Sequence, residues 1–168
     1  VRGQVATVTS AARAAESVAE ISQRCRQRVQ EGASAPEHLL FGARWNNIRR
    51  LQIGNGEALL TLELPAVYAP DLAEFPLHPA LMDMATAGAQ ALIPGHGDAF
   101  YVPASYGAVR VHAPLTRCLA SHVRWRGDEG GDLAVFDVTV CDARGRVLVD
   151  IDEFTMLRVR DKALLAAP

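Results

Sequence analysis

The sequence predicts an α+β domain in which a curved antiparallel sheet wraps around one long buried helix. Two patterns support this class. Several segments alternate apolar and polar residues with a period of two, which is typical of strands that bury one face. One segment, LHPALMDMATAGAQALI (residues 77–93), places apolar or small side chains on every side of a helix, which indicates a helix surrounded by protein.

Composition indicates a single globular domain. The chain has 168 residues, of which 49% are apolar and 21% charged, and its net charge is −2 with the basic residues scattered. This pattern gives no electrostatic footprint for nucleic acid or for an anionic membrane. The three cysteines match no zinc spacing, no apolar run approaches the ~20 residues of a membrane span, and the first residues do not resemble a signal peptide. We therefore expect reduced thiols and a cytoplasmic location.

The first 36 residues are expected to precede the main sheet. Residues 1–10 alternate weakly and are compatible with a short strand. Residues 11–30 are rich in helix formers, and their apolar residues follow helical spacing, so we predict a linker helix there. The segment EGASAP (31–36) breaks this helix. The residues at helical spacing are Val18, Ile21, Cys25 and Val29.

A β-hairpin is predicted over residues 48–64. Two apolar-rich runs flank the sequence GNG at 54–56, a Gly/Asn turn of the kind that joins neighbouring antiparallel strands. In the second run the apolar residues alternate with more polar ones, so one face of the hairpin should be buried. These apolar residues are Ala58, Leu60, Leu62 and Leu64.

The central helix is predicted over residues 79–93. Pro79 suits its first turn, where a missing backbone N–H leaves no hydrogen bond unmade. Four antiparallel strands should follow: one each in 105–114 and 118–126, and two in 132–159 about a turn. One buried helix in the curve of an antiparallel sheet is the hotdog architecture.

Four blocks of the sequence, in this order, resemble the polyketide synthase dehydratase family. LHPALMDMA closely resembles the H-P-A-L-x-D signature in the second half of these double-hotdog domains. FGARWNNIRRL, upstream of it, resembles the G-Y-G-P-x-F block, and YVPASYGAVRVHAP, downstream, resembles the L-P-F-x-W block. VFDVTVCDARGRVLVDIDEFTMLRV resembles the closing strand pair with its D-x-x-G-R-x-V turn. The blocks together span residues 41–159.

The resemblance implies a domain organisation. Residues 37–160 would form the C-terminal hotdog of a dehydratase domain, and residues 1–36 would hold the end of the preceding hotdog's last strand and a linker helix. Residues 161–168 would be a tail.

The resemblance also implies a reaction. Asp83, the aspartate of the signature, would be the general acid that removes water from a β-hydroxyacyl thioester to give an α,β-unsaturated thioester. The substrate would be carried on the phosphopantetheine of an acyl carrier protein, with no dissociable cofactor, in a synthase that is a homodimer. The N-terminal hotdog would supply the catalytic histidine. Substrate contacts would come from the matched blocks: Phe41, Gly42, His78, Pro79, Val102, Pro103 and Tyr106.

The sequence departs from the family pattern at informative positions. Ala43 replaces a proline, and Tyr106 stands where the third block usually has tryptophan. The family commonly has Gln or His four residues after the aspartate, where this sequence has Ala87. Alanine cannot make the hydrogen bond that would orient the carboxyl group. The family's histidine motif, H-x3-G-x4-P, is matched only by spacing at His38, because Asn47 occupies the proline position. We therefore expect the catalytic histidine outside this chain, which alone should be nearly inactive.

The chemistry explains why the family places an acid at Asp83. Hydroxide is a poor leaving group, so an acid must protonate it while a base removes the α-proton, and each such group contributes about 10²–10⁴ in rate. Burial among apolar neighbours favours the neutral acid, whereas the first turns of a helix favour the carboxylate. We expect burial to dominate in a helix that is apolar on all sides.

Other interpretations remain open. His78 could be a base, but it lies roughly 140° around the helix from Asp83, so it more simply caps the helix. Trp45 and Trp125 fit packing better than substrate binding, and no histidine lies at metal-ligand spacing. A double-bond isomerase or cyclase on the same fold, or a non-catalytic hotdog that binds acyl chains or acts as a scaffold, are the alternative functions.

Overall fold

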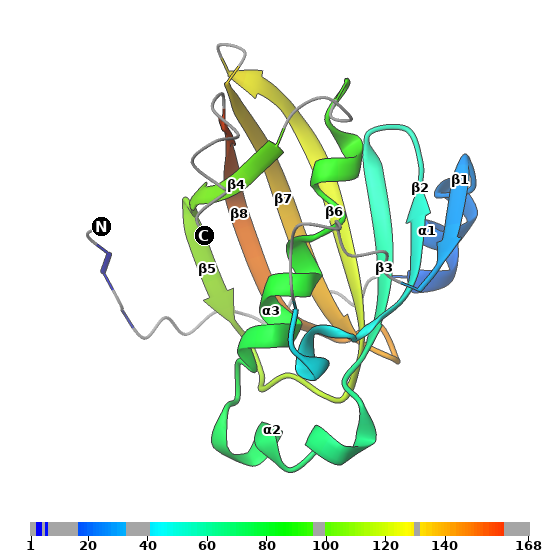
Figure 1. Cartoon of the computed structure of the whole chain (residues 1–168), viewed down its shortest axis with the longest axis vertical. Helices are drawn as coiled ribbons and strands as arrows, with labels where there is room; N and C mark the ends of the chain where they lie inside the picture. Colours follow the sequence, from blue (N-terminus) through cyan, green and yellow to red (C-terminus); the bar gives the residue numbers. More distant parts are fainter. Residues whose placement is uncertain are drawn as a thin grey trace.

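The structure is a computed structural model that describes residues 3, 4, 6, 17–32, 41–95, 100–129 and 132–159. Within these residues, eight strands form one antiparallel sheet in the order β1-β2-β3-β6-β7-β8-β4, and β5 pairs with a second part of β8 (Figure 1). The strands are β1 (Arg28–Glu31), β2 (Ile48–Ile53), β3 (Glu57–Glu63), β4 (Phe100–Ser105), β5 (Ala108–Val111), β6 (Cys118–Glu129), β7 (Leu133–Asp142) and β8 (Val147–Val159).

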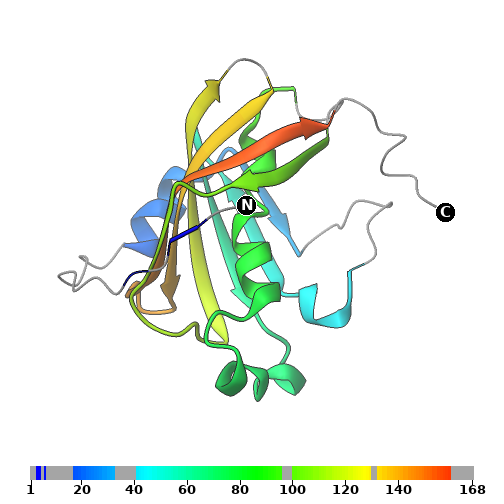
Figure 2. The same cartoon turned by 90° about the vertical axis from the view of Figure 1, so that its left-hand side faces the viewer.

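Helices cover both faces of the sheet. Figure 2 shows helix α3 (Pro79–Thr86) within the curve of the sheet and α1 (Val18–Arg24) on the opposite side. The remaining helical segments are α2 (Asp71–Glu74) and the 3₁₀ turns η1 (Ala43–Trp45), η2 (Ala66–Tyr68) and η3 (Gln90–Leu92). The predicted α+β hotdog arrangement is thus confirmed, and none of the described helices is long and apolar enough to cross a membrane.

The predicted hairpin is confirmed as β2 and β3. Ala58, Leu60, Leu62 and Leu64 are all completely buried and belong to the core on the α3 side. Glycine is required at the turn for two reasons: Gly56 has φ of +68°, and a Cβ on Gly54 would lie 2.9 Å from the backbone oxygen of Arg24. The turn therefore fixes the register that points these four side chains inward.

Helix α3 is shorter than predicted, ending at Thr86 rather than near residue 93. The carbonyl oxygen of Ala85 accepts a hydrogen bond from the Ser121 hydroxyl on β6, at 2.7 Å. The N–H of Ala89 bonds instead to Thr86, three residues back, at 3.0 Å. The Ala85 carbonyl, which would accept the N–H of Ala89 in a continued α-helix, instead bonds to the sheet, and the helix tightens and ends here.

Only one side of α3 is buried, which also differs from the prediction of a helix surrounded by protein. The buried side packs against β3, β6 and β7 and comprises Ala80, Leu81, Met84, Ala85 and Thr86. Asp83 and Ala87, four residues apart and thus on one face, are exposed. The apolar residues that suggested burial on all sides therefore cover the side that meets the sheet, and the other face is open.

Helix α1 packs on the outer face of the sheet. Ile21 and Cys25 contact Leu59 and Ala120, whose side chains point away from the core on the α3 side. Burial raises the pKa of Cys25 to about 11, with the nearby Glu57 carboxylate adding to the effect. Cys25 is therefore a packing residue and a poor nucleophile.

The N-terminal prediction is wrong in part. The described portion of the expected helix at 11–30 is α1, and residues 28–31 form strand β1, which pairs Arg28 with Ile53 of β2. Cys25 caps α1, so the chain turns back along the sheet edge instead of continuing as a helix. The suggested strand at 1–10 lies largely outside the described residues, as does the predicted tail. The boundary near residue 37 stays a prediction, with β1 joining the sheet from its N-terminal side.

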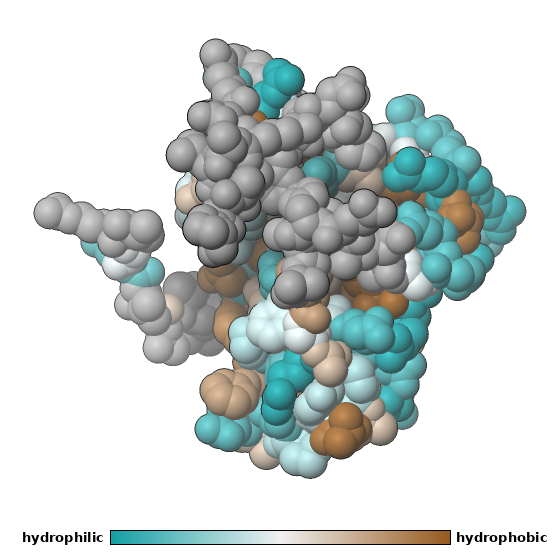
Figure 3. All heavy atoms as spheres, in the orientation of Figure 1, coloured by the Kyte–Doolittle hydropathy of each residue, from teal (hydrophilic) through white to brown (hydrophobic). Residues whose placement is uncertain are grey.

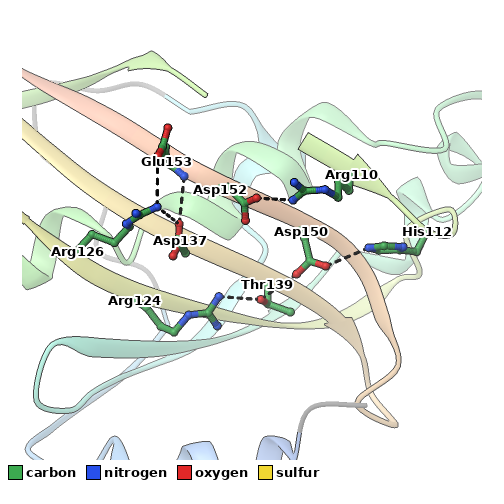
Figure 4. Close-up of polar contacts among 9 residues, drawn as sticks. All are labelled: Arg110, His112, Arg124, Arg126, Asp137, Thr139, Asp150, Asp152 and Glu153. Atoms are coloured by element: carbon green, nitrogen blue, oxygen red, sulfur yellow. Dashed lines mark hydrogen bonds and ion pairs between the residues drawn. The ribbon is translucent and has the colours of Figure 1, made fainter. Parts of the chain in front are cut away.

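The outer face of the sheet also carries a buried polar network, shown in Figure 4. Thr139, completely buried, donates a hydrogen bond to Asp150 at 3.1 Å and lies 3.2 Å from a guanidinium nitrogen of Arg124. The other carboxylate oxygen of Asp150 lies 3.0 Å from His112 Nε2. Because the neighbours of Asp150 on β8 belong to the core, this network points away from α3.

We predict that the close packing of the turn after α3 limits residue 88 to glycine. A Cβ there would lie 2.5 Å from Leu60 Cδ1, and Leu60 is completely buried, so Gly88→Ala should destabilise the domain by about 1–3 kcal/mol. Denaturant unfolding of the chain measures this. In a Leu60→Ala background the same change should have a smaller effect because the contact is gone. Equal effects in both backgrounds would contradict this packing.

Candidate functional site

Asp83 lies on the open face of α3. The signature residues around it form the helix as the sequence requires: Pro79 occupies the first turn, and the carbonyl of His78 accepts the N–H groups of Leu81 and Met82. The expectation that Asp83 is buried is wrong for this chain, since its side chain is exposed. The carboxyl group is therefore accessible to a ligand or partner on this side of the helix.

Trp45 provides the hydrogen-bond partner of Asp83. The indole Nε1–H donates to Asp83 Oδ2 at 2.7 Å. Among the described residues, none donates a side-chain or backbone hydrogen bond to Oδ1. One oxygen of the carboxyl group is thus held by the protein, and the other has no hydrogen-bond donor among the described residues.

Tyr106 is the third member of the site. Burial and the negative charge of Asp83 both raise the pKa of Tyr106, burial being the larger cause, so the phenol lies within electrostatic range of the carboxylate. Its ring stacks on the buried Phe154, with centroids 5.4 Å apart. The phenol is thus held on a rigid part of the core while half of the side chain stays exposed.

The backbone around Tyr106 explains its position. Strand β4 pairs with β8 as far as Thr155, and β5 begins opposite Asp152, so the chain kinks at Tyr106 and Gly107. A Cβ on Gly107 would lie 2.8 Å from the Cβ of Glu153, a residue with φ of +54°. Glycine is therefore needed where this kink meets the irregular part of β8, and Tyr106 directly precedes it, stacked on Phe154 of β8.

The turn that carries Trp45 is fixed to α3 by a buried amide. Asn47 is completely buried, and its side-chain N–H₂ donates to the carbonyl oxygens of Arg44 and Ala80, both at 3.0 Å. The first bond closes η1 on itself and the second ties η1 to the first turn of α3. The indole and the carboxyl group are consequently mounted on one connected unit.

An ion pair holds α2 against the same turn. Arg44 donates to Asp71 at 2.6 Å, and its guanidinium lies over the Tyr68 ring at 4.3 Å from the centroid. The hydrogen bond from Arg44 is the main reason that the pKa of Asp71 is lowered, and His78, 3.5 Å away, contributes less. His78 is almost fully buried behind the helix start, with Nδ1 lacking a partner among the described residues.

The other predicted contact residues lie around this centre. Phe41 and Gly42 lead into η1 and are exposed, as is Pro79 at the start of α3. Val102 and Pro103 lie on β4 opposite Leu157 and Met156, with Val102 half-buried and Pro103 exposed. Within this predicted set, Tyr106 lies within electrostatic range of Asp83. For every residue of the set, Asp83, Tyr106 and His78 included, a catalytic role or substrate contact stays a prediction.

The remaining described histidines serve the opposite face of the sheet. His112 pairs with Asp150, and His122 Nε2 lies 2.8 Å from Glu57 Oε2. Because Arg124 has only donors and approaches His122 Nδ1 at 3.2 Å, that nitrogen accepts and Nε2 carries the proton given to Glu57. His38 and His96 lie outside the described residues. Within the described part of the chain, no cluster of His, Cys, Asp and Glu is suited to a metal.

Trp45 is the site residue that sequence reasoning missed. It was expected to pack, as Trp125 does edge-on against Phe136 with centroids 5.1 Å apart. A signal was available, since Trp45 occupies the last aromatic position of the block FGARW, where the related pattern has phenylalanine. An indole at a phenylalanine position adds one N–H donor. Asp83 lacks the usual donor at residue 87, so its carboxyl group could accept a hydrogen bond from this indole.

The surface around the site is mixed in character. Figure 3 shows apolar side chains over β5 at the sheet edge and polar ones over much of the visible lower half. The exposed large apolar residues of β5 are Val109 and Val111, and Leu157 of β8 is also exposed. Scattered apolar residues are ordinary on a protein surface, so they do not by themselves mark a binding site.

Comparison with known proteins gives a consistent result. A family model described as the polyketide synthase dehydratase N-terminal domain matches residues 13–166. Two proteins of Bacillus subtilis (strain 168) are similar to the chain: polyketide synthase PksN is 33% identical over 116 residues, and polyketide synthase PksM is 27% identical over 117. The matches cover 68% and 65% of this chain but 2% and 3% of those proteins.

Solved structures show the same fold. A trans-AT polyketide synthase dehydratase domain from Brevibacillus brevis superposes with a TM-score of 0.78 at 21% identity, covering 88% of this chain and 54% of that chain. An inactive mutant of the CurJ dehydratase, solved with a bound compound, gives a TM-score of 0.79 at 21% identity, covering 95% and 58%. The chain thus spans little more than half of each solved domain.

The proximity of Tyr106 and Asp83 predicts a linked titration. Asp83→Asn removes the negative charge that contributes to the raised pKa of Tyr106, whereas burial remains, so the pKa of Tyr106 should fall part of the way toward its usual value. An NMR titration of carbon-labelled tyrosines in this chain measures it, with Tyr106→Phe assigning the signal. Tyr68 and Tyr101 serve as internal controls. If the pKa of Tyr106 is the same in the wild type and in Asp83→Asn, the two groups do not interact and the prediction is wrong.

Proposed function

The chain belongs to the polyketide synthase dehydratase family, and from this premise we propose that it supplies the C-terminal hotdog of a domain that eliminates water from β-hydroxyacyl thioesters. The observation that carries the proposal is the geometry of Asp83. It lies on the open face of α3, with one oxygen held by Trp45 and the other without a hydrogen-bond donor among the described residues.

The assignment to the C-terminal half rests on the residues themselves, although the matching family model carries the words N-terminal domain. The aspartate signature lies on the helix of the sheet described above. The histidine motif of the first half is matched only at His38, with Asn47 at its proline position. Asn47 is buried in a structural role, which supports the view that this match is accidental. Coverage of 54–58% of solved dehydratase chains fits one half of a double domain.

The proposed reaction uses one proton donor from this chain. A histidine of the other half takes the proton from Cα, whose acidity the thioester carbonyl increases. The electron pair forms the Cα–Cβ double bond as the Cβ–O bond breaks. Asp83 gives its proton to the departing oxygen, which leaves as water, and the resulting carboxylate is reprotonated before the next turnover.

The open face of α3 supports a partner on that side. An acid of this kind must hold a proton when the substrate arrives, and exclusion of water by a second hotdog would favour the neutral form. Phe41, just before η1, and Tyr106 are large side chains left 42% and 50% exposed. Their burial by such a partner would contribute to the stability of the assembled domain.

We assign the substrate and partners by the same reasoning. The acyl chain is delivered as a thioester on the phosphopantetheine of an acyl carrier protein, and no dissociable cofactor takes part. Val102, Pro103 and Tyr106 contact the acyl chain, and Phe41, Gly42, His78 and Pro79 contribute to its binding site. The complete domain works in the cytoplasm within a homodimeric synthase.

The proposal predicts that activity needs both halves. The isolated chain should not dehydrate a 3-hydroxyacyl thioester, and the complete domain should, with a product lighter by one water in mass spectrometry. Asp83→Asn in the complete domain should lower turnover by about 10²–10⁴-fold because the acid is lost. Unchanged turnover would favour a non-catalytic hotdog, and a product of unchanged mass would indicate isomerisation instead.

A further inference from the structure

We propose that Trp45 is the positioning residue for Asp83, replacing the glutamine or histidine that related sequences carry four residues after the aspartate. The inference rests on the proposed function and adds to it how this chain orients its acid. The replacement involves two positions together: an alanine at 87, which removes one donor, and a tryptophan at 45, which adds another.

The loss at position 87 is visible in the structure. Ala87 follows Asp83 by one turn, keeps helical backbone angles and is exposed on the same face. A longer polar side chain there could reach the carboxyl group, as the family pattern implies. A methyl group can neither donate nor accept a hydrogen bond, so α3 itself does not hold the Asp83 side chain.

Trp45 supplies the missing interaction from a different element. Its Nε1–H donates to Oδ2 at 2.7 Å, within the normal range for a hydrogen bond from N–H to oxygen. Indole N–H is a donor only, so it always requires Oδ2 to accept. When the acid is protonated, this arrangement favours the proton on Oδ1, the oxygen that has no hydrogen-bond donor among the described residues. The bond thus selects which oxygen meets the substrate hydroxyl.

The mounting of Trp45 suits a positioning role. Asn47 ties η1 to the carbonyl oxygen of Ala80 on α3, and the backbone N–H of Asn47 bonds to the Trp45 carbonyl at 2.8 Å. The carbonyl of Asn47 in turn accepts from Glu63 on β3 at 2.7 Å. The indole is therefore fixed relative to both the helix and the sheet, which lowers the entropy lost when the acid is oriented.

Packing alone does not account for Trp45. The other tryptophan, Trp125, is half-buried like Trp45 and packs against the same core, edge-on to the buried Phe136, so it serves as the packing reference within the chain. Trp45 is half-buried, and its polar end is directed at a carboxyl group. A phenylalanine at residue 45 would keep most of the apolar contact and lose only the donor, so the two roles can be separated by substitution.

The first test uses this chain alone and needs no activity. The indole N–H resonance of Trp45 in a nitrogen-labelled sample should move as acid protonates Asp83, and it should stay in place in Asp83→Asn. The indole resonance of Trp125 is the internal control and should not follow Asp83. A Trp45 resonance that is insensitive to Asp83 would overturn the proposal, whatever the activity of the domain.

The second test uses the complete domain. Trp45→Phe should reduce kcat for water elimination by about 10- to 100-fold with a smaller change in KM, because a misplaced acid affects the chemical step. Adding Ala87→Gln to Trp45→Phe should raise kcat by about tenfold over Trp45→Phe alone, because the glutamine returns a hydrogen-bond donor to α3. Ala87→Leu in the same background adds similar bulk without a donor and should restore nothing.

The controls separate the possible failures. Trp125→Phe should change kcat by less than about twofold, and circular dichroism verifies that each variant is folded. If the wild-type domain is active, a Trp45→Phe variant with undiminished kcat would overturn the positioning role. Equal rescue of Trp45→Phe by Ala87→Gln and by Ala87→Leu would also overturn it. A wild-type domain that eliminates no water would instead refute the proposed function, and the resonance test would then decide alone whether Trp45 orients Asp83.

Discussion

Helix α3 has to bury one side in the curve of the sheet while presenting a carboxyl group on the other. The two demands meet within eight residues. Its buried side packs against β3 and β6, and near its end the carbonyl of Ala85 accepts a hydrogen bond from the Ser121 hydroxyl on β6. The packing of α3 on the sheet thus sets where the Asp83 backbone lies, and the bond from Trp45 holds its carboxyl group. Any change that moved the helix along the sheet would move the acid with it.

The rest of the site is arranged around this helix by irregular backbone. Trp45 comes from a 3₁₀ turn that Asn47 joins to α3, and Tyr106 comes from a kink where β4 and β5 meet the distorted part of β8. Neither side chain lies on a regular strand. Regular elements provide the scaffold, and the interruptions between them direct the polar groups toward the acid.

The architecture followed from the sequence because its strands have a simple period. The alternation from Ala58 to Leu64 predicted both the strand and its buried face, and the GNG turn predicted its partner. The length and exposure of α3 did not follow, because Ser121, which ends the helix, lies 36 residues away in sequence. Likewise residues 28–30 are predicted as helix because Val29 follows helical spacing, whereas their pairing with β2 makes them part of strand β1.

The site residues that belong to a sequence motif could be predicted, whereas the residue that reaches the site through a tertiary contact could not. Asp83 and Tyr106 belong to the blocks that resemble the dehydratase family, so they were identified by position. The bond from Trp45 depends on the approach of two segments 38 residues apart, which no spacing rule describes. Burial of Asp83 was expected from the apolar composition of the helix, but composition does not tell which side faces the sheet.

The two interactions that hold η1, the ion pair of Arg44 with Asp71 and the hydrogen bonds of Asn47, depend differently on ionic strength. The pair of Arg44 with Asp71 is largely at the surface, and dissolved ions weaken such pairs. The amide of Asn47 is sealed from water and carries no net charge, so ionic strength barely affects it. Added salt should therefore loosen α2 from its neighbour while leaving the indole in register with the acid. The orientation of the acid should therefore depend little on the salt concentration.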